Sequence, residues 1–246
     1  VISDAQAMIR ERRNPDIDID SIPIDDATTY QLLAQGDTIG VFQLESSPMR
    51  ALIRSLIPTK LEDLSAVLAL YRPGPMANIP EYIERKHGRK QVVYPHPMLK
   101  EILEPTFGIM IYQEQIMQVA QVMAGYTLGS ADILRKAMGK KNKEVMEKNR
   151  TIFIEGARKN GVSEKEAGEI FTTMEKFAEY GFNRSHSVAY AVVAFHTTYL
   201  KAHYPAEFMA SALTHNMSSV EEMQKFLSDC KRLGIKTLGP DINESE

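Results

Sequence analysis

Hydrophobic positions recur at helical spacing along most of the chain, three and four residues apart. The pattern predicts helices over residues 3–13, 27–33, 47–56, 62–70, 114–123, 130–138, 143–160, 163–180, 185–203, 206–215 and 218–233. Two short apolar runs, residues 38–43 and 108–112, have the length and the flanking glycines of strands instead. We therefore expect a mainly α fold, an irregular multi-helix domain with one or two short β-strands.

Capping residues place the ends of these helices. The pair Asp25-Asp26 and the residue Ser163 precede helical patterns as N-caps, because their side-chain oxygens can accept a bond from a free backbone N–H. Gly181 follows such a pattern, and we expect it to be a left-handed C-terminal residue. We expect Ser185 or Ser187 to begin the next helix.

The composition is that of an ordinary globular protein. The 246 residues are 43% hydrophobic and 25% charged, with a net charge of −3, which excludes a collagen-like or largely disordered chain. The single cysteine, Cys230, excludes an internal disulfide framework and a Cys-based zinc site. No apolar run approaches the roughly 20 residues of a membrane span. We expect a cytoplasmic protein, and a chain from Val1 to Glu246 indicates a piece of a longer one.

Charge is unevenly distributed along the chain. Residues 1–40 hold eight acidic and three basic side chains, whereas residues 131–160 hold nine basic and four acidic ones. A local positive segment on a mildly acidic protein favours a phosphate contact over general DNA binding. A solvated helix face is the alternative that charge alone leaves open.

The basic segment contains the first candidate site. Arg135, Lys136, Lys140 and Lys141 lie on or just after one helical turn, so their cations can converge on a triphosphate. Arginine can add a bidentate contact, which lysine cannot. The alternative is that these cations only complement the C-terminal end of a helix.

A polar, glycine-broken turn between two apolar helices is the second candidate. Asn183, Arg184 and His186 provide hydrogen-bond donors there, and Tyr180 and Phe182 provide stacking faces. The alternative is a loop whose polar residues only cap the following helix.

Metal-binding patterns are weak. Asp16, Asp18 and Asp20 would share one face of a strand and could hold magnesium, but the following Pro23 favours an exposed acidic connector. The remaining histidines lack acidic partners at ligand spacing. We predict no metal site in this chain.

Six segments together carry a resemblance to a known family. They are GVFQLES (40–46), ALYRPGP (69–75), GIMIYQEQIM (108–117), LRKAMGKK (134–141), YGFNRSHS (180–187) and LKAHYP (200–205). In this order they resemble the alpha subunit of bacterial DNA polymerase III, the C-family replicative DNA polymerase, along essentially the whole chain. The family often has Arg-Arg at Arg135-Lys136 and Lys at Arg184, so the first departure loses one bidentate fork.

The resemblance implies the fingers region of that subunit, and hence DNA replication by a nucleotidyltransferase. Residues 1–26 would be a helix and acidic connector after the missing palm, 27–238 the helical fingers domain, and 239–246 a linker toward a missing DNA- and clamp-binding region. The palm aspartates that hold Mg²⁺ in the parent enzyme would lie outside this chain. It would therefore contain no catalytic residue and be inactive alone.

The resemblance also implies roles and partners. Arg135, Lys136, Lys140 and Lys141 would bind the nucleotide phosphates. The residues facing the nucleotide or primer would be Asn183, Arg184, His186, Gln113 and Arg72. The partners would be the deoxynucleoside triphosphate (dNTP), primer-template DNA, other parts of the alpha subunit, and replicase holoenzyme subunits including the sliding clamp, the last through the missing regions. No membrane is implied. The alternative is a self-sufficient helical module that binds nucleic acid or a partner without a catalytic role.

Overall fold

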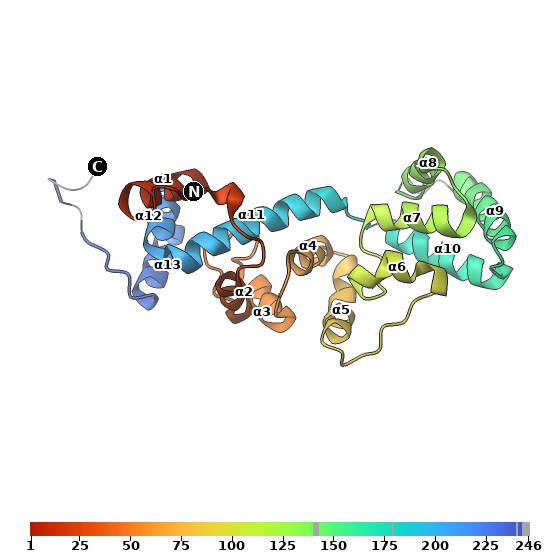
Figure 1. The fold of residues 1–246 in the computed structure, drawn as a ribbon, viewed down its shortest axis with the longest axis horizontal. Helices are drawn as coiled ribbons and strands as arrows, with labels where there is room; N and C mark the ends of the chain where they lie inside the picture. Colours follow the sequence, from red (N-terminus) through yellow and green to blue (C-terminus); the bar gives the residue numbers. More distant parts are fainter. Residues whose placement is uncertain (140–142, 179, 240, 243–246) are drawn as a thin grey trace. The chain divides into compact units, whose positions relative to one another are not determined.

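The computed structural model describes residues 1–139, 143–178, 180–239 and 241–242 (Figure 1). The described residues form thirteen α-helices and four short 3₁₀ helices. The α-helices are α1 (Ile2–Arg12), α2 (Ala27–Gln35), α3 (Ser47–Leu56), α4 (Leu61–Leu70), α5 (Ile79–Lys86), α6 (Lys100–Leu103), α7 (Gln113–Ala124), α8 (Leu128–Gly139), α9 (Lys143–Lys159), α10 (Glu164–Ala178), α11 (Arg184–His203), α12 (Pro205–His215) and α13 (Val220–Arg232). The mainly α prediction is confirmed.

The predicted strands were wrong, since no strand occurs within the described residues. Residues 38–43 form a tight turn, closed where the Thr38 hydroxyl donates to the Leu44 carbonyl at 2.6 Å. Residues 108–112 are extended at their end, but the Gln115 side chain accepts bonds from the Ile111 and Tyr112 amides at 2.8 and 3.0 Å. The segment also makes one isolated parallel bridge, from Tyr112 to Phe182, so it pairs at a single residue without forming a strand.

The chain folds as two units. Unit 1 comprises Val1–Asp63 and Tyr190–Glu246, and unit 2 comprises Leu64–Ala189. The chain passes between the units within α4 and α11. The domain boundaries expected after residues 26 and 238 stay predictions.

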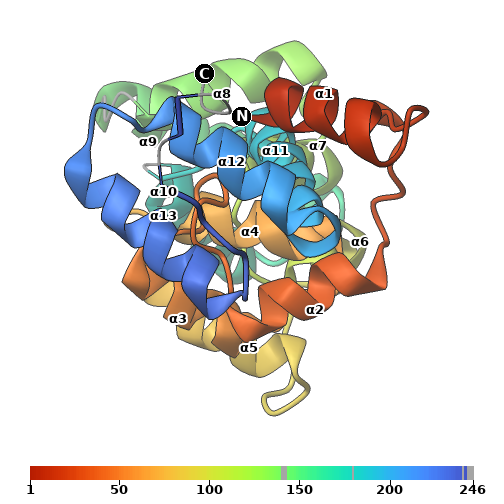
Figure 2. The same ribbon diagram turned by 90° about the vertical axis from the view of Figure 1, so that its left-hand side faces the viewer.

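Unit 1 is built from packed helix pairs. Helix α1 lies against α12, α12 against α13, and α2 against α3 (Figure 2). The predicted Asp26 cap is confirmed, because its carboxylate accepts the Thr29 amide at 2.7 Å. Unit 1 also encloses an ion pair, in which the buried Lys201 ammonium lies 2.8 Å from the Asp229 carboxylate.

Unit 2 packs α7, α8, α9 and α10 around one apolar core (Figure 1). The core includes Leu99, Leu103, Met110, Ile116, Val119, Ala120, Met123, Ala131, Leu134, Met138, Met146, Phe153, Ala157, Val162, Ala167, Ile170, Phe171 and Met174. These residues recur at helical spacing, which is why the sequence pattern found their helices. The predicted Ser163 cap is confirmed, and Glu166 completes a reciprocal capping box with it.

Helices α7 and α9 approach closely at Gly156. A Cβ atom at this position would lie 2.2 Å from the Ala124 carbonyl oxygen, so any side chain forces the helices apart. We expect Gly156→Ala to lower the free energy of unfolding by about 1–3 kcal/mol, the usual cost of overpacking. Gly129→Ala on α8 is the matched control, because a Cβ there meets nothing within 4 Å. Urea unfolding of both variants measures the difference, and equal stability would contradict the close approach.

Candidate functional site

The N-terminal turn of α7 connects several distant segments of unit 2. Its first three residues, Gln113, Glu114 and Gln115, are called the hub segment below. All three side chains form hydrogen bonds with segments outside α7. Polar residues are favoured here because the first N–H groups of a helix have no partner within the helix.

Gln113 joins α8 to the segment that precedes α11. Its Oε1 accepts a bond from Arg135 Nη1 at 3.1 Å, and its Nε2 donates to the Gly181 carbonyl at 3.0 Å. The Gln113 backbone amide also donates to the Phe182 carbonyl at 2.9 Å. The arginine of the basic segment and residues 181–186, called the α11 turn below, are therefore linked through one residue.

Glu114 holds the start of α11 itself. Its carboxylate accepts Asn183 Nδ2 at 2.9 Å and the Arg184 backbone amide at 3.0–3.1 Å. The other end of the Asn183 amide, Oδ1, accepts the His186 amide at 2.9 Å. Asn183 is therefore the N-cap of α11, and the expectation that Ser185 or Ser187 begins this helix was wrong.

Gly181 does not have the predicted left-handed conformation, since its φ lies outside that region. Space explains the glycine instead, because a Cβ there would lie 3.2 Å from Gln113 Cγ. A Cβ atom at this position would require its neighbours to shift by a few tenths of an ångström.

A buried polar network lies beneath the α11 turn. Ser187 donates to the Ser65 carbonyl at 2.6 Å, and the Ser65 hydroxyl lies 2.9 Å from the Tyr112 hydroxyl and 3.0 Å from that of Ser187. Both serines are almost fully buried. Satisfied buried networks of this kind fix one arrangement of the chain, so the first turn of α11 has a defined position.

Arg72 braces the other side of the α11 turn. Its guanidinium lies 4.4 Å from the Phe182 ring centre and donates to the Tyr180 carbonyl at 2.8 Å. Burial lowers the pKa of Arg72 from its ordinary value. Gly74, at φ +101°, lies under the Tyr180 ring, where a Cβ would come within 2.5 Å of a ring carbon. Arg72 thus shapes the turn through stacking and a backbone contact.

Two cations on α8 converge on one carboxylate. Asp132 accepts Arg135 Nη2 and Nε at 2.7 and 3.0 Å, and its other oxygen lies 2.7 Å from Lys136 Nζ. Hydrogen bonds from Lys136 and Arg135 lower the pKa of the Asp132 carboxyl. The Lys136 side chain is 61% exposed and that of Arg135 is 24% exposed. An arrangement that binds a carboxylate in this way suits phosphate oxygens too.

The structure brings together many of the residues singled out from the sequence. Gln113, Arg135 and the α11 turn with Asn183, Arg184 and His186 are joined by hydrogen bonds, and Arg72 contacts the same turn. Lys140 and Lys141 lie outside the described residues.

Sequence reasoning missed the structural roles of Glu114, Gln115 and Ser65. Three consecutive polar residues, 113–115, at the start of an apolar helix were the signal available for two of them.

The acidic run 16–20 has a structural role at the surface of unit 1. The Asp18 carboxylate accepts the Asp20 amide at 3.4 Å and caps a 3₁₀ turn, Ile19–Ser21. Within the described residues, no group of three or more His, Cys, Asp or Glu side chains could hold a metal ion.

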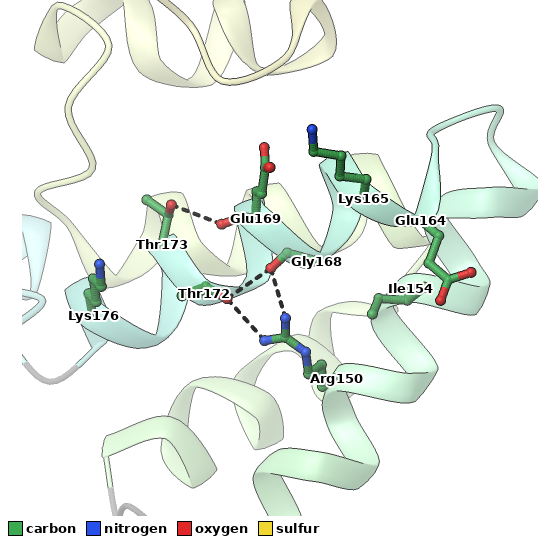
Figure 3. Close-up of a pocket in the computed structure, with 9 residues that line it drawn as sticks. All are labelled: Arg150, Ile154, Glu164, Lys165, Gly168, Glu169, Thr172, Thr173 and Lys176. Carbon is green, nitrogen blue, oxygen red and sulfur yellow. Dashed lines mark hydrogen bonds between the residues drawn. The ribbon is translucent and has the colours of Figure 1, made fainter.

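A groove of about 640 Å³ lies between α9 and α10, and both positively and negatively charged side chains line it (Figure 3). Arg150 spans it, with its guanidinium donating to Thr172 Oγ1 at 3.0 Å and to the Gly168 carbonyl at 3.2 Å. The cation is thus engaged within the protein, and Figure 3 shows it turned toward α10. None of the described site residues predicted from the sequence lines this groove, so we do not regard it as the candidate site.

None of the described helices has the length and apolar character needed to cross a membrane.

Comparison with known proteins gives a consistent result. Residues 1–161 match the family model described as the bacterial DNA polymerase III alpha subunit finger domain. The chain is 50% identical to the DNA polymerase III subunit alpha of Escherichia coli K12, with 99% of this chain and 22% of the relative covered. The corresponding protein of Neisseria meningitidis Z2491 is 49% identical (100% and 21% covered), and that of Thermus aquaticus is 48% identical (99% and 20%). The chain thus spans about a fifth of the length of these curated relatives.

Proposed function

The chain belongs to the finger-domain family of bacterial DNA polymerase III alpha subunits, and from this premise we propose that it positions the incoming dNTP and the primer-template for DNA synthesis. One observation carries the proposal. Arg135 and the α11 turn, which are distant in sequence, are linked through Gln113. Groups suited to the phosphates and groups suited to the sugar, base or primer end therefore belong to one site.

Arg135 and Lys136 are the proposed contacts to the β- and γ-phosphates. Asp132 and Gln113 already hold the Arg135 guanidinium in one orientation, so little side-chain entropy remains to be lost on binding. Lys136 is the more exposed cation and supplies charge at the same spot. Lys140 and Lys141 follow on the same chain segment, and we propose that they add to the positive field.

Arg184 and His186 are the proposed groups that face the nucleotide or the primer terminus. Both are exposed on the first turn of α11. The His186 ring lies 5.4 Å from the Phe182 ring, and the Arg184 guanidinium lies 5.8 Å from the Tyr112 ring centre. Three other side chains form hydrogen bonds with protein atoms on several sides: Arg72, Gln113 and Asn183. We propose that they hold the site in shape.

The metal chemistry of the parent polymerase belongs, in this proposal, to other parts of the longer protein. Bound Mg²⁺ would stabilise the charge that develops on the transferred phosphoryl group. The described residues provide no cluster that fits such an ion, so we derive no step through a metal here. The contribution of this chain would be orientation of the triphosphate and of the nascent base pair. The sliding clamp and the other replicase subunits would bind regions beyond this chain.

The self-sufficient DNA-binding module is the weaker alternative. Such a module needs cations that are available to many phosphates along a duplex. Asp132 instead pairs with both Arg135 and Lys136, which confines their charge to one spot. This pairing favours a site that works only when completed by its neighbours.

We therefore expect the 246-residue chain alone to bind duplex DNA and dNTP weakly and to extend no primer. The measurement is a fluorescence titration of each ligand onto the chain at two salt concentrations, together with a primer-extension assay. Tight DNA binding that falls steeply with salt would instead identify a self-sufficient module, because each neutralised phosphate releases counterions. Robust primer extension by the pure chain would contradict the proposal that the metal-holding aspartates lie outside this chain.

A further inference from the structure

Glu114 has an unusual position among the acids of unit 2. It lies in the first turn of α7, and its carboxylate accepts bonds from the first turn of α11. The N-terminal ends of both helices carry partial positive charge, which stabilises a carboxylate placed between them. The contact joins residues 70 positions apart in the sequence, so it sets tertiary and not local structure.

The bonds of Glu114 act together with the buried Ser65–Ser187 network to set where the α11 turn lies. Its oxygens bind the Asn183 side chain and the Arg184 amide, and Asn183 in turn caps the helix through the His186 amide. The adjacent residue, Gln113, binds Arg135 and the Gly181 carbonyl. Two neighbouring residues on one rigid helical turn therefore hold both parts of the proposed site.

We infer that Glu114 is a positioning residue for nucleotide binding, which fixes the α11 turn at one distance from Arg135; this inference rests on the proposed function. Without its carboxylate, the α11 turn loses three bonds and samples other arrangements. The nucleotide then binds only the fraction of molecules that have the competent arrangement. The apparent affinity for the nucleotide falls in proportion to that fraction, while the catalytic rate of the bound complex stays the same.

The test is steady-state primer extension by the full-length alpha subunit that contains this chain, with dATP as the varied nucleotide. Glu114→Ala should raise KM for dATP about tenfold and leave kcat within about twofold, if the competent fraction falls to roughly a tenth. Glu114→Gln keeps an acceptor oxygen and should raise KM less, by about threefold. Glu155→Ala, which removes an exposed acid of α9, is the matched control and should change neither constant.

The outcomes separate this inference from the proposed function. If Arg135→Ala raises KM and Glu114→Ala leaves it unchanged, the proposed function stands and the role of Glu114 is wrong. A fall in kcat alone would show a loss of folded enzyme, which a merely structural residue produces, and would also overturn the inference. If neither Arg135→Ala nor Glu114→Ala changes KM, the nucleotide site itself is wrong.

Hydrogen exchange of the 246-residue chain gives a second readout that needs no activity. Glu114→Ala should speed exchange of the Arg184 and His186 amides by about tenfold or more and leave exchange in the core of α9 unchanged. Unchanged exchange at both amides would contradict the inference, because it would mean that the turn keeps its position without the carboxylate.

Discussion

Replacing Arg135 with alanine in the full-length alpha subunit should lower kcat/KM for dNTP by tenfold or more. A hydrogen bond to a charged group contributes about 1.5–3 kcal/mol, which corresponds to roughly 10- to 150-fold in this constant. We expect the Arg135→Ala effect to lie within this range, because Asp132 and Gln113 orient the guanidinium before the nucleotide binds. Primer extension at limiting nucleotide measures the effect directly, since the rate then follows kcat/KM.

Two further variants make this measurement specific. Arg135→Lys keeps the charge and loses the planar fork, so it should fall between the wild type and alanine. Lys159→Ala removes an exposed cation at the end of α9 and should leave the rate unchanged. An unchanged rate at limiting nucleotide in Arg135→Ala would contradict the phosphate contact.

Replacing Lys201 with alanine should destabilise unit 1 by about 3–5 kcal/mol, the usual cost of removing one partner from a buried ion pair. The Lys201 side chain is 1% exposed, and its ammonium contacts the Asp229 carboxylate at 2.8 Å, the Asp37 carboxylate at 3.3 Å and the Ile39 carbonyl at 2.8 Å. Its removal leaves the buried Asp229 and Asp37 carboxylates with Arg232 as a shared cationic partner, so we expect a loss at the lower end of this range. Urea unfolding of the 246-residue chain measures the loss.

The pH dependence of this variant provides a check. Burial acts to raise the pKa of Asp37, but bonds and charge from Arg232 and Lys201 dominate and hold it below its ordinary value of 3.8. A lowered carboxyl pKa gives stability that is present above pH 3.8 and lost as the pH falls further. The difference in the free energy of unfolding between wild type and Lys201→Ala should therefore shrink in acid.

Lys236→Ala changes an exposed position and is the control, so its free energy of unfolding should fall by less than about 0.5 kcal/mol. An equally small loss in Lys201→Ala would contradict the buried ion pair.

The helices could be predicted because their signals are local. The apolar period located α7, α9 and α10, and Asp26 and Ser163 cap their helices as expected. The strands could not be predicted correctly, because their pairing depends on what lies beside them. Gln115 provides the acceptor for residues 111 and 112, and no short-range pattern reveals that a side chain will do so.

The candidate site was predictable as a set of residue types but not as a geometry. Arg135 and Gln113 are 22 positions apart, and Gln113 and Gly181 are 68 apart. Their contact depends on how α7 and α8 pack and on where α11 begins. Asn183 shows the same limit: both ends of its amide bond to protein groups, and no short-range pattern predicts its contact with Glu114.

The central claim is that one nucleotide contacts both Arg135 and the α11 turn. Hydrogen exchange of the full-length alpha subunit, bound to primer-template with and without dNTP, tests this claim most directly. We predict that the nucleotide slows exchange in peptides covering both 132–138 and 181–187, and that Arg135→Ala removes the slowing in both. Slowing in neither segment, or in only one of them, would contradict the account.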